Sequence, residues 1–91
     1  MSDANNLSEI SDSIKNFIAQ NMLYADDGFN FPDDVSFLQE GIIDSLGVMQ
    51  LVEFVTKEFG INVEQREVTP ENFDSVGKLT LFIQRKQQAK S

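Results

Sequence analysis

The sequence predicts an all-α fold with three main helices and one short helix. Apolar residues recur three or four positions apart in three segments, which is the spacing of one face of an amphipathic helix. No segment alternates apolar and polar residues over a sustained run, so no strand is expected. The chain has 91 residues, 41% of them hydrophobic, and is expected to form a single domain over residues 1–91 with one modest core.

The first helix is expected over residues 7–22, because six apolar residues there share one helical face. They are Leu7, Ile10, Ile14, Phe17, Ile18 and Met22. Asn6, followed three residues later by Glu9, fits a capping box at the start of this helix. Residues 1–5, and residues 87–91 at the opposite end of the chain, are expected to be flexible tails.

A long loop is expected between the first two helices, because residues 24–41 contain Gly28, Pro32 and four aspartates. It also contains Phe29, Phe31, Phe37 and Leu38, and its aromatic residues are expected to attach it to the core. The aspartates do not have the spacing of a calcium-binding EF-hand loop, and runs of charge are usually solvated. No metal site is therefore predicted.

The second helix is expected to begin at Asp44 and Ser45 and to end at Phe59, with Gly60 as its C-cap. Leu51, Val55 and Phe59 are four residues apart and are expected to face the core. Asp and Ser are both preferred N-cap residues, so the local pattern alone indicates a helix cap. Phe54 lies off the core stripe and is expected to pack against the loop.

Two more helices are expected near the C-terminus. Thr69 as cap and Pro70 at the first helical position predict a short third helix. Asp74 or Ser75 is expected to cap the last helix. The core face of that helix is predicted to consist of Val76, Leu79, Phe82 and Ile83.

The composition excludes several kinds of chemistry. The chain has no Cys and no His, so it can build neither a zinc-thiolate site nor a Ser-His-Asp triad. Histidine is also the commonest general base in enzymes. A chain of this size buries limited surface, so a deep water-excluding cleft is not expected. We therefore expect a protein that is not itself an enzyme.

The charge indicates the class of partner. Fifteen acidic residues against seven basic ones give a formal net charge of −8, which opposes nucleic-acid binding and favours a basic protein surface. No apolar run approaches the ~18 residues of a membrane span. The first residues, MSDANNLSE, lack the basic and apolar regions of a secretory signal, so a cytoplasmic location is expected.

The context of Ser45 suggests a role beyond capping. Ser45 follows a polar loop, so its hydroxyl is expected to be exposed at a helix N-terminus, where backbone N–H groups and the helix dipole favour an attached phosphate. Leu46 and Met49 are partly off the core stripe, and exposed apolar residues beside a helix start suggest a partner surface.

These residues belong to a longer pattern. The segment SFLQEGIIDSLGVMQLVEFVTKEFGINV, from Ser36 to Val63, resembles the central part of an acyl or peptidyl carrier protein. The similarity continues through Glu71, Asn72, Phe73, Asp74 and Ser75 into the final helix, and so extends over nearly the whole chain.

The resemblance implies a four-helix bundle of acyl-carrier-protein type, a monomer, with 4'-phosphopantetheine attached to Ser45. A phosphopantetheinyl transferase would move this arm from coenzyme A, using magnesium, and the thiol of the arm would hold an acyl or aminoacyl group as a thioester. An acyl- or aminoacyl-loading ligase or adenylating enzyme and a downstream synthase or transferase are the other implied partners. The residues expected to meet these enzymes are Asp44, Leu46, Met49, Gln50 and Glu53.

The cargo is left open by the sequence. The outward positions of the second helix form a mixed set, namely Gly47, Gln50, Glu53, Thr56, Lys57 and Glu58. The phrase EGIIDSLGVMQLV is closest to D-alanyl carrier proteins and to other stand-alone aminoacyl or secondary-metabolism carriers. The alternative hypothesis is a small acidic helical adaptor without a prosthetic group, in which Ser45 is only a helix cap.

Overall fold

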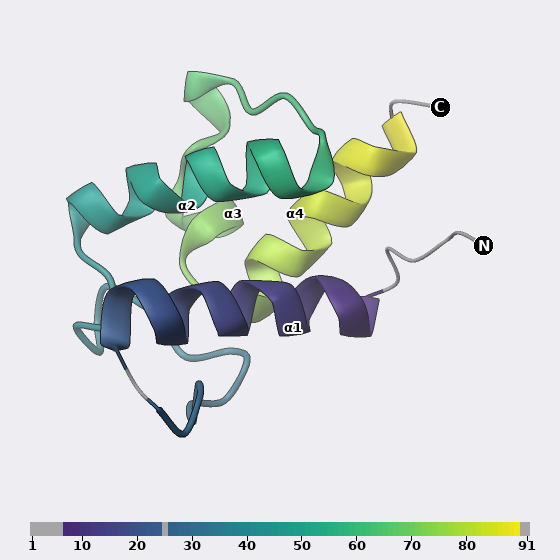
Figure 1. The fold of residues 1–91 in the computed structure, drawn as a ribbon. Helices are drawn as coiled ribbons and strands as arrows, with labels where there is room; N and C mark the ends of the chain where they lie inside the picture. Colours follow the sequence, from purple (N-terminus) through teal and green to yellow (C-terminus); the bar gives the residue numbers. More distant parts are fainter. Residues whose placement is uncertain (1–6, 25, 90–91) are drawn as a thin grey trace.

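All of the regular structure is helical in the residues that the computed structural model describes, 7–24 and 26–89 (Figure 1). The elements are α1 (Leu7–Ile18), a π-helical turn η1 (Ala19–Leu23), α2 (Ser45–Phe59), a 3₁₀ turn η2 (Gln65–Glu67), α3 (Pro70–Phe73) and α4 (Val76–Ala89). The predicted all-α class, with three main helices and one short one, is confirmed.

The first helix continues to the predicted end but changes its winding. α1 ends at Ile18, and η1 carries the chain on as a single wider turn. Tyr24 closes this turn: its backbone N–H donates to the carbonyl of Ala19, five residues earlier, and its φ of 51° and ψ of 42° are left-handed. Asn6 and residues 1–5 lie outside the described residues, so the predicted capping box and N-terminal tail do too.

α2 begins and ends where the sequence predicts. Asp44 is its N-cap, and Gly60 ends it with a φ of 65°, a left-handed conformation that glycine adopts without steric cost. Leu51 and Val55 are fully buried, and Phe59 is half-buried. The ring of Phe54 stacks on Phe17 of α1 with a centroid separation of 4.2 Å and lies edge-on to Phe59.

The C-terminal part contains one element that the sequence did not indicate. η2 is held by a reciprocal capping box between Glu64 and Glu67. Pro70 begins α3 as predicted, whereas Thr69 makes no side-chain capping bond. Ser75 caps α4, since its Oγ accepts the N–H of Lys78 at 3.1 Å.

Part of the segment predicted to be a flexible C-terminal tail is helical. Residues 87–89 belong to α4, which continues to Ala89, and residues 90–91 lie outside the described part. Residues 84–89 read QRKQQA, and Gln, Arg, Lys and Ala all have high helix propensity, so the helix can continue past the point where its core contacts end.

The core lies where the four α-helices and the loop meet. α1 and α3 both pack on α4, while α1 and α2 run in opposite directions across one side of the bundle (Figure 1). All four predicted core residues of α4 are buried. The cluster consists of Ile10, Ile14, Ile18, Phe37, Ile42, Ile43, Leu51, Val55, Ile61, Phe73, Val76, Leu79, Phe82 and Ile83.

The loop before α2 is attached to this core mainly by one aromatic ring. Phe37 is fully buried, and Phe29 packs half-buried against the cluster with its ring edge-on to Phe37. Phe31 remains exposed, so it does not anchor the loop as predicted, and the neighbouring Leu38 is exposed too. Within the described residues, no helix is long and apolar enough to cross a membrane.

Candidate functional site

Ser45 is the first residue of α2, and it is exposed. The side-chain cap of the helix comes from its neighbour: Asp44 Oδ1 accepts the backbone N–H of Gly47 at 2.8 Å. In the described part of the chain, the Ser45 hydroxyl has no hydrogen-bond partner. The hydroxyl is thus accessible at a helix N-terminus, where free N–H groups favour an anionic substituent.

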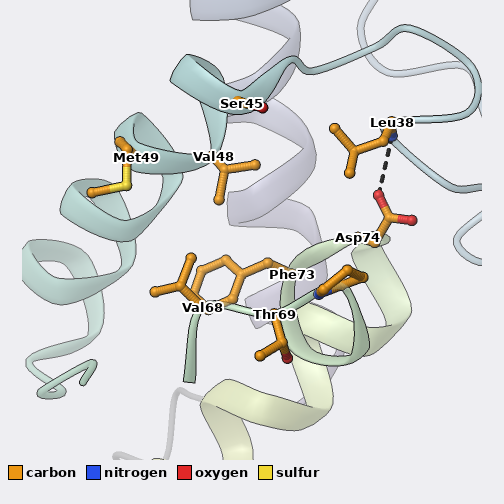
Figure 2. A pocket seen from close by; sticks show the side chains of 9 residues that line it. Leu38, Ser45, Val48, Met49, Val68, Thr69, Phe73 and Asp74 are labelled. Carbon is orange, nitrogen blue, oxygen red and sulfur yellow. Dashed lines mark hydrogen bonds between the residues drawn. The ribbon is translucent and has the colours of Figure 1, made fainter. Parts of the chain in front are cut away.

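An apolar pocket of about 220 Å³ opens beside Ser45, between α2 and α3 (Figure 2). Val48 and Met49 form the α2 wall, and Phe73 lies opposite them with the chain that leads into α3. The complete lining is Leu38, Ser45, Val48, Met49, Val68, Thr69, Pro70, Phe73 and Asp74. An exposed hydroxyl therefore stands at the rim of an apolar hollow.

Asp74 fixes the loop at one edge of this pocket. Its Oδ1 accepts the backbone N–H of Leu38 at 3.0 Å, which Figure 2 shows as a dashed line. Its Oδ2 accepts the hydroxyl of Ser36, and its backbone carbonyl accepts the N–H of Phe37 at 2.8 Å. Asp74 thus holds the loop instead of capping α4, the other role that the sequence allowed.

The first turn of α2 is packed tightly against the end of the loop. Gly47 is buried, not outward-facing as the sequence suggested. A Cβ atom at this position would lie 2.6 Å from Cγ2 of the buried side chain of Ile43, closer than real Cβ contacts allow. Glycine here lets the loop approach α2, and this approach fixes where Ser45 emerges.

The five predicted partner residues line three different hollows. Met49 lines the pocket beside Ser45. Asp44, Leu46 and Gln50 line a different hollow, on the side of α2 that faces η1. Glu53 lines the neighbouring hollow between α2 and the end of α1, together with Gln50. The pocket beside Ser45 and Met49 and the hollow beside Leu46 and Gln50 therefore border different elements, α3 and η1, on two sides of α2.

Several pocket residues were not predicted from the sequence. Val68, Thr69, Phe73 and Asp74 lie more than twenty residues after Ser45, and only the fold brings them beside it. Only Phe73 could have been recognised in the sequence as part of a packed surface, because a single aromatic residue in a four-residue helix has to pack against a neighbouring element. The sequence pattern also did not identify Tyr24 or the residues of η1 as part of a possible interaction surface.

Among the described residues, the one carboxyl group with a clearly shifted pKa lies away from Ser45. The pKa of Glu67 is lowered by the backbone N–H of Glu64, which donates to its Oε1 at 2.9 Å, and then by the ammonium of Lys86 at 3.0 Å. This arrangement connects η2 to α4. Among residues 7–24 and 26–89, no three acidic side chains gather in a way that could hold a metal ion.

Comparison with known proteins finds similarity to solved structures. No protein-family model matches the chain, and no curated protein does. A chain in a solved structure named "Crystal structure of FAD-dependent dehydrogenase" is similar in fold, with a TM-score of 0.63 and 30% sequence identity. The similarity covers 76% of this chain and 96% of that one. Because 76% of 91 residues corresponds to 96% of the other chain, that chain is about 72 residues long.

Proposed function

We propose that this protein is a carrier of the acyl or peptidyl carrier type, with a 4'-phosphopantetheine arm attached to Ser45. The observation that supports it most directly is the exposed, unpartnered Ser45 hydroxyl at the first position of α2. The cap of α2 is made by Asp44. The adaptor hypothesis needs Ser45 to be the cap, so it has less support.

The residues around Ser45 fit such a group. A phosphodiester on Oγ would lie against the first N–H groups of α2, in the favourable end of the helix dipole. The arm contributes the thiol that this Cys-free chain lacks, and that thiol holds acyl or aminoacyl cargo as a thioester.

Attachment needs an external catalyst, because the chain has no histidine to act as a base. The Ser45 hydroxyl forms the new oxygen–phosphorus bond, and coenzyme A loses adenosine 3',5'-bisphosphate. The hydroxyl proton passes to a base of the phosphopantetheinyl transferase. The role of this chain in the step is to hold Ser45 exposed and the first turn of α2 rigid.

The pocket beside Ser45 supports a small cargo. Its volume of about 220 Å³ lies below the roughly 300–1,000 Å³ of pockets that hold drug-sized ligands. Val48, Met49 and Phe73 would shield a short apolar group or part of the arm from water. A short acyl or aminoacyl group therefore fits better than a long fatty chain.

The similar solved structure suggests a class of partner. Dinucleotide cofactors such as FAD commonly bind βαβ units, and all of the regular structure in the described residues of this chain is helical. We therefore assign any flavin chemistry to a separate enzyme and include an FAD-dependent dehydrogenase among the candidate partners. The others are the transferase, a loading ligase or adenylating enzyme, and a downstream synthase or transferase.

The test is the intact mass of the protein after incubation with coenzyme A, magnesium and a broad-specificity phosphopantetheinyl transferase. We expect one phosphopantetheine increment on the wild type and none on Ser45→Ala, with both proteins equally helical by circular dichroism. An unmodified wild type, under conditions that modify a known carrier protein, would favour the adaptor hypothesis.

A further inference from the structure

The two most exposed large hydrophobic side chains in the described part of the chain lie in the same hollow. Tyr24 is 81% exposed and Leu46 is 77% exposed, and both line the hollow between η1 and the start of α2, with Asn21 and Gln50. Single exposed apolar residues are common on protein surfaces, whereas adjacent ones mark interaction sites. This hollow is on the opposite side of α2 from the pocket beside Ser45.

Tyr24 is held in a costly backbone conformation. It is the only residue other than glycine with a positive φ among the described residues, and the left-handed region costs a non-glycine residue about 1 kcal/mol or more. A helix end of this shape is usually made by Gly or Asn at lower cost. The chain places a large ring there instead, at the end of a π-turn, and such turns occur frequently at functional sites.

The neighbouring hollow, which Tyr24 also lines, is lined by both acidic and aromatic side chains. Glu53 and Glu58 line it with a single cation, Lys57. The stacked rings of Phe17 and Phe54 also line this hollow. An arginine guanidinium suits these surroundings better than an ammonium group, because it stacks on aromatic rings and pairs with carboxylates at the same time.

We infer that Tyr24, Leu46, Gln50 and Glu53 form the docking surface for enzymes that act on Ser45, and that such an enzyme inserts an arginine there. The guanidinium stacks on Tyr24 and pairs with Glu53, while an apolar side chain of the enzyme covers Leu46. The net charge of −8 attracts a basic surface of this kind. This inference rests on the proposed function for the identity of the partner, and it leaves the pocket beside Ser45 free for the arm and its cargo.

The first test does not depend on the prosthetic group. The isotope-labelled chain is titrated with N-acetyl-arginine amide, with N-acetyl-lysine amide as the matched probe, and backbone amide shifts are recorded. We expect saturable shifts at residues 21–24 and 50–58 with the arginine probe. Tyr24→Asn, which removes the ring but suits the left-handed backbone, should abolish them, and Tyr24→Phe should retain them. Equal shifts in wild type and Tyr24→Asn would overturn the inference.

The second test measures kcat/KM of the transferase on the unmodified chain. Loss of an interface hot spot typically costs more than 1 kcal/mol, so Tyr24→Asn and Glu53→Gln should each lower kcat/KM by roughly tenfold. Leu81→Ser, at a half-exposed position on α4, is the control. Equal rates for Tyr24→Asn and this control would contradict the inference. If wild type is not modified at all, the proposed function fails, and the probe titration alone decides whether the surface binds arginine.

Discussion

At the scale of single residues, Asp44 combines two roles that substitution can separate. Its Oδ1 accepts the N–H of Gly47 and so caps α2, and its charge lies next to Ser45 in the sequence. Alanine removes both the cap and the charge. Asparagine removes only the charge, because Asn caps helices about as well as Asp.

We expect Asp44→Ala to lower the free energy of unfolding by about 1 kcal/mol, the usual cost of losing an N-cap. Asp44→Asn should stay within about 0.5 kcal/mol of wild type, yet be modified more slowly by the transferase, because the charge that attracts a basic enzyme is gone. Urea denaturation and initial rates of modification measure the two effects. A normal rate for Asp44→Asn would show that the enzyme does not use this charge.

At the scale of elements, Asp74 connects the loop before α2 to the start of α4. One carboxylate accepts both the hydroxyl of Ser36 and the N–H of Leu38, across 36 or more residues of sequence. This connection forms an edge of the pocket beside Ser45. The loop is thus positioned by a side-chain bond from a distant helix junction as well as by burial of Phe37.

We expect Asp74→Ala to destabilise the fold by about 1–3 kcal/mol, since hydrogen bonds to a charged group are worth more than neutral ones. The amide of Leu38 should lose protection against hydrogen exchange, whereas the amide of Phe37 bonds a backbone carbonyl and should keep part of its protection. Ser36→Ala is the control, because it removes the bonds of the Ser36 hydroxyl to Asp74 and to the N–H of Gln39 but leaves the bond of Leu38 to Asp74 in place. Unchanged exchange at Leu38 in Asp74→Ala would contradict this account.

The contribution of Glu67, which connects η2 to α4, to the stability of the fold should decrease at acidic pH. The folded-state pKa of Glu67 lies below its ordinary value of 4.5 because of the Glu64 N–H and the Lys86 ammonium. A carboxyl group with a lowered pKa stabilises the fold fully above its ordinary value, and this contribution is lost as the pH falls through the folded-state pKa. The loss is therefore expected below about pH 4.5.

Thermal midpoints measured between pH 3 and 7 test this expectation. Glu67→Gln should be less stable than wild type at pH 7, and the difference should shrink as the pH falls below 4.5. Glu71→Gln, at an exposed position on α3, is the matched control and should run parallel to wild type. A gap between Glu67→Gln and wild type that stays constant over this range would show that the carboxylate does not make the contribution.

At the scale of the whole molecule, local patterns predicted most of the fold. Apolar spacing located the buried faces of α1, α2 and α4, and Gly60 and Pro70 marked a helix end and a helix start. The misses have physical causes. The bonds of η2 are made by Glu64 and Glu67 in a segment without apolar periodicity, and the packing of Phe54 on Phe17 depends on how α1 lies against α2.

The site was less predictable than the fold. Ser45 could be singled out because its neighbours form a recognisable local pattern, but the pocket beside it depends on Val68 and Phe73, which only tertiary packing brings there. Sequence reasoning placed Leu46 and Met49 on one partner surface. They are three residues apart on a helix, yet the hollows beside them open on different sides of α2.

This two-sided arrangement of α2 gives a prediction about the molecule as a whole. Leu46→Ser should lower kcat/KM of the transferase by roughly tenfold, because it removes an exposed apolar contact of the docking surface. Met49→Ser should leave that rate within about twofold. It should instead speed the spontaneous hydrolysis of a short acyl thioester on the arm, because water gains access to the pocket beside Ser45. Both side chains are more than half exposed, at 77% and 55%, so neither change should unfold the protein.

The two assays, run on both variants, decide whether the sides of α2 act separately. Opposite patterns, with Leu46→Ser affecting only modification and Met49→Ser only hydrolysis, would mean that partner docking and cargo shielding use different faces of one helix. An enzyme could then hold the carrier through the side that faces η1 while the cargo leaves the α3 side. If both variants slow modification equally, α2 presents a single continuous interface, and the pocket beside Ser45 is part of it.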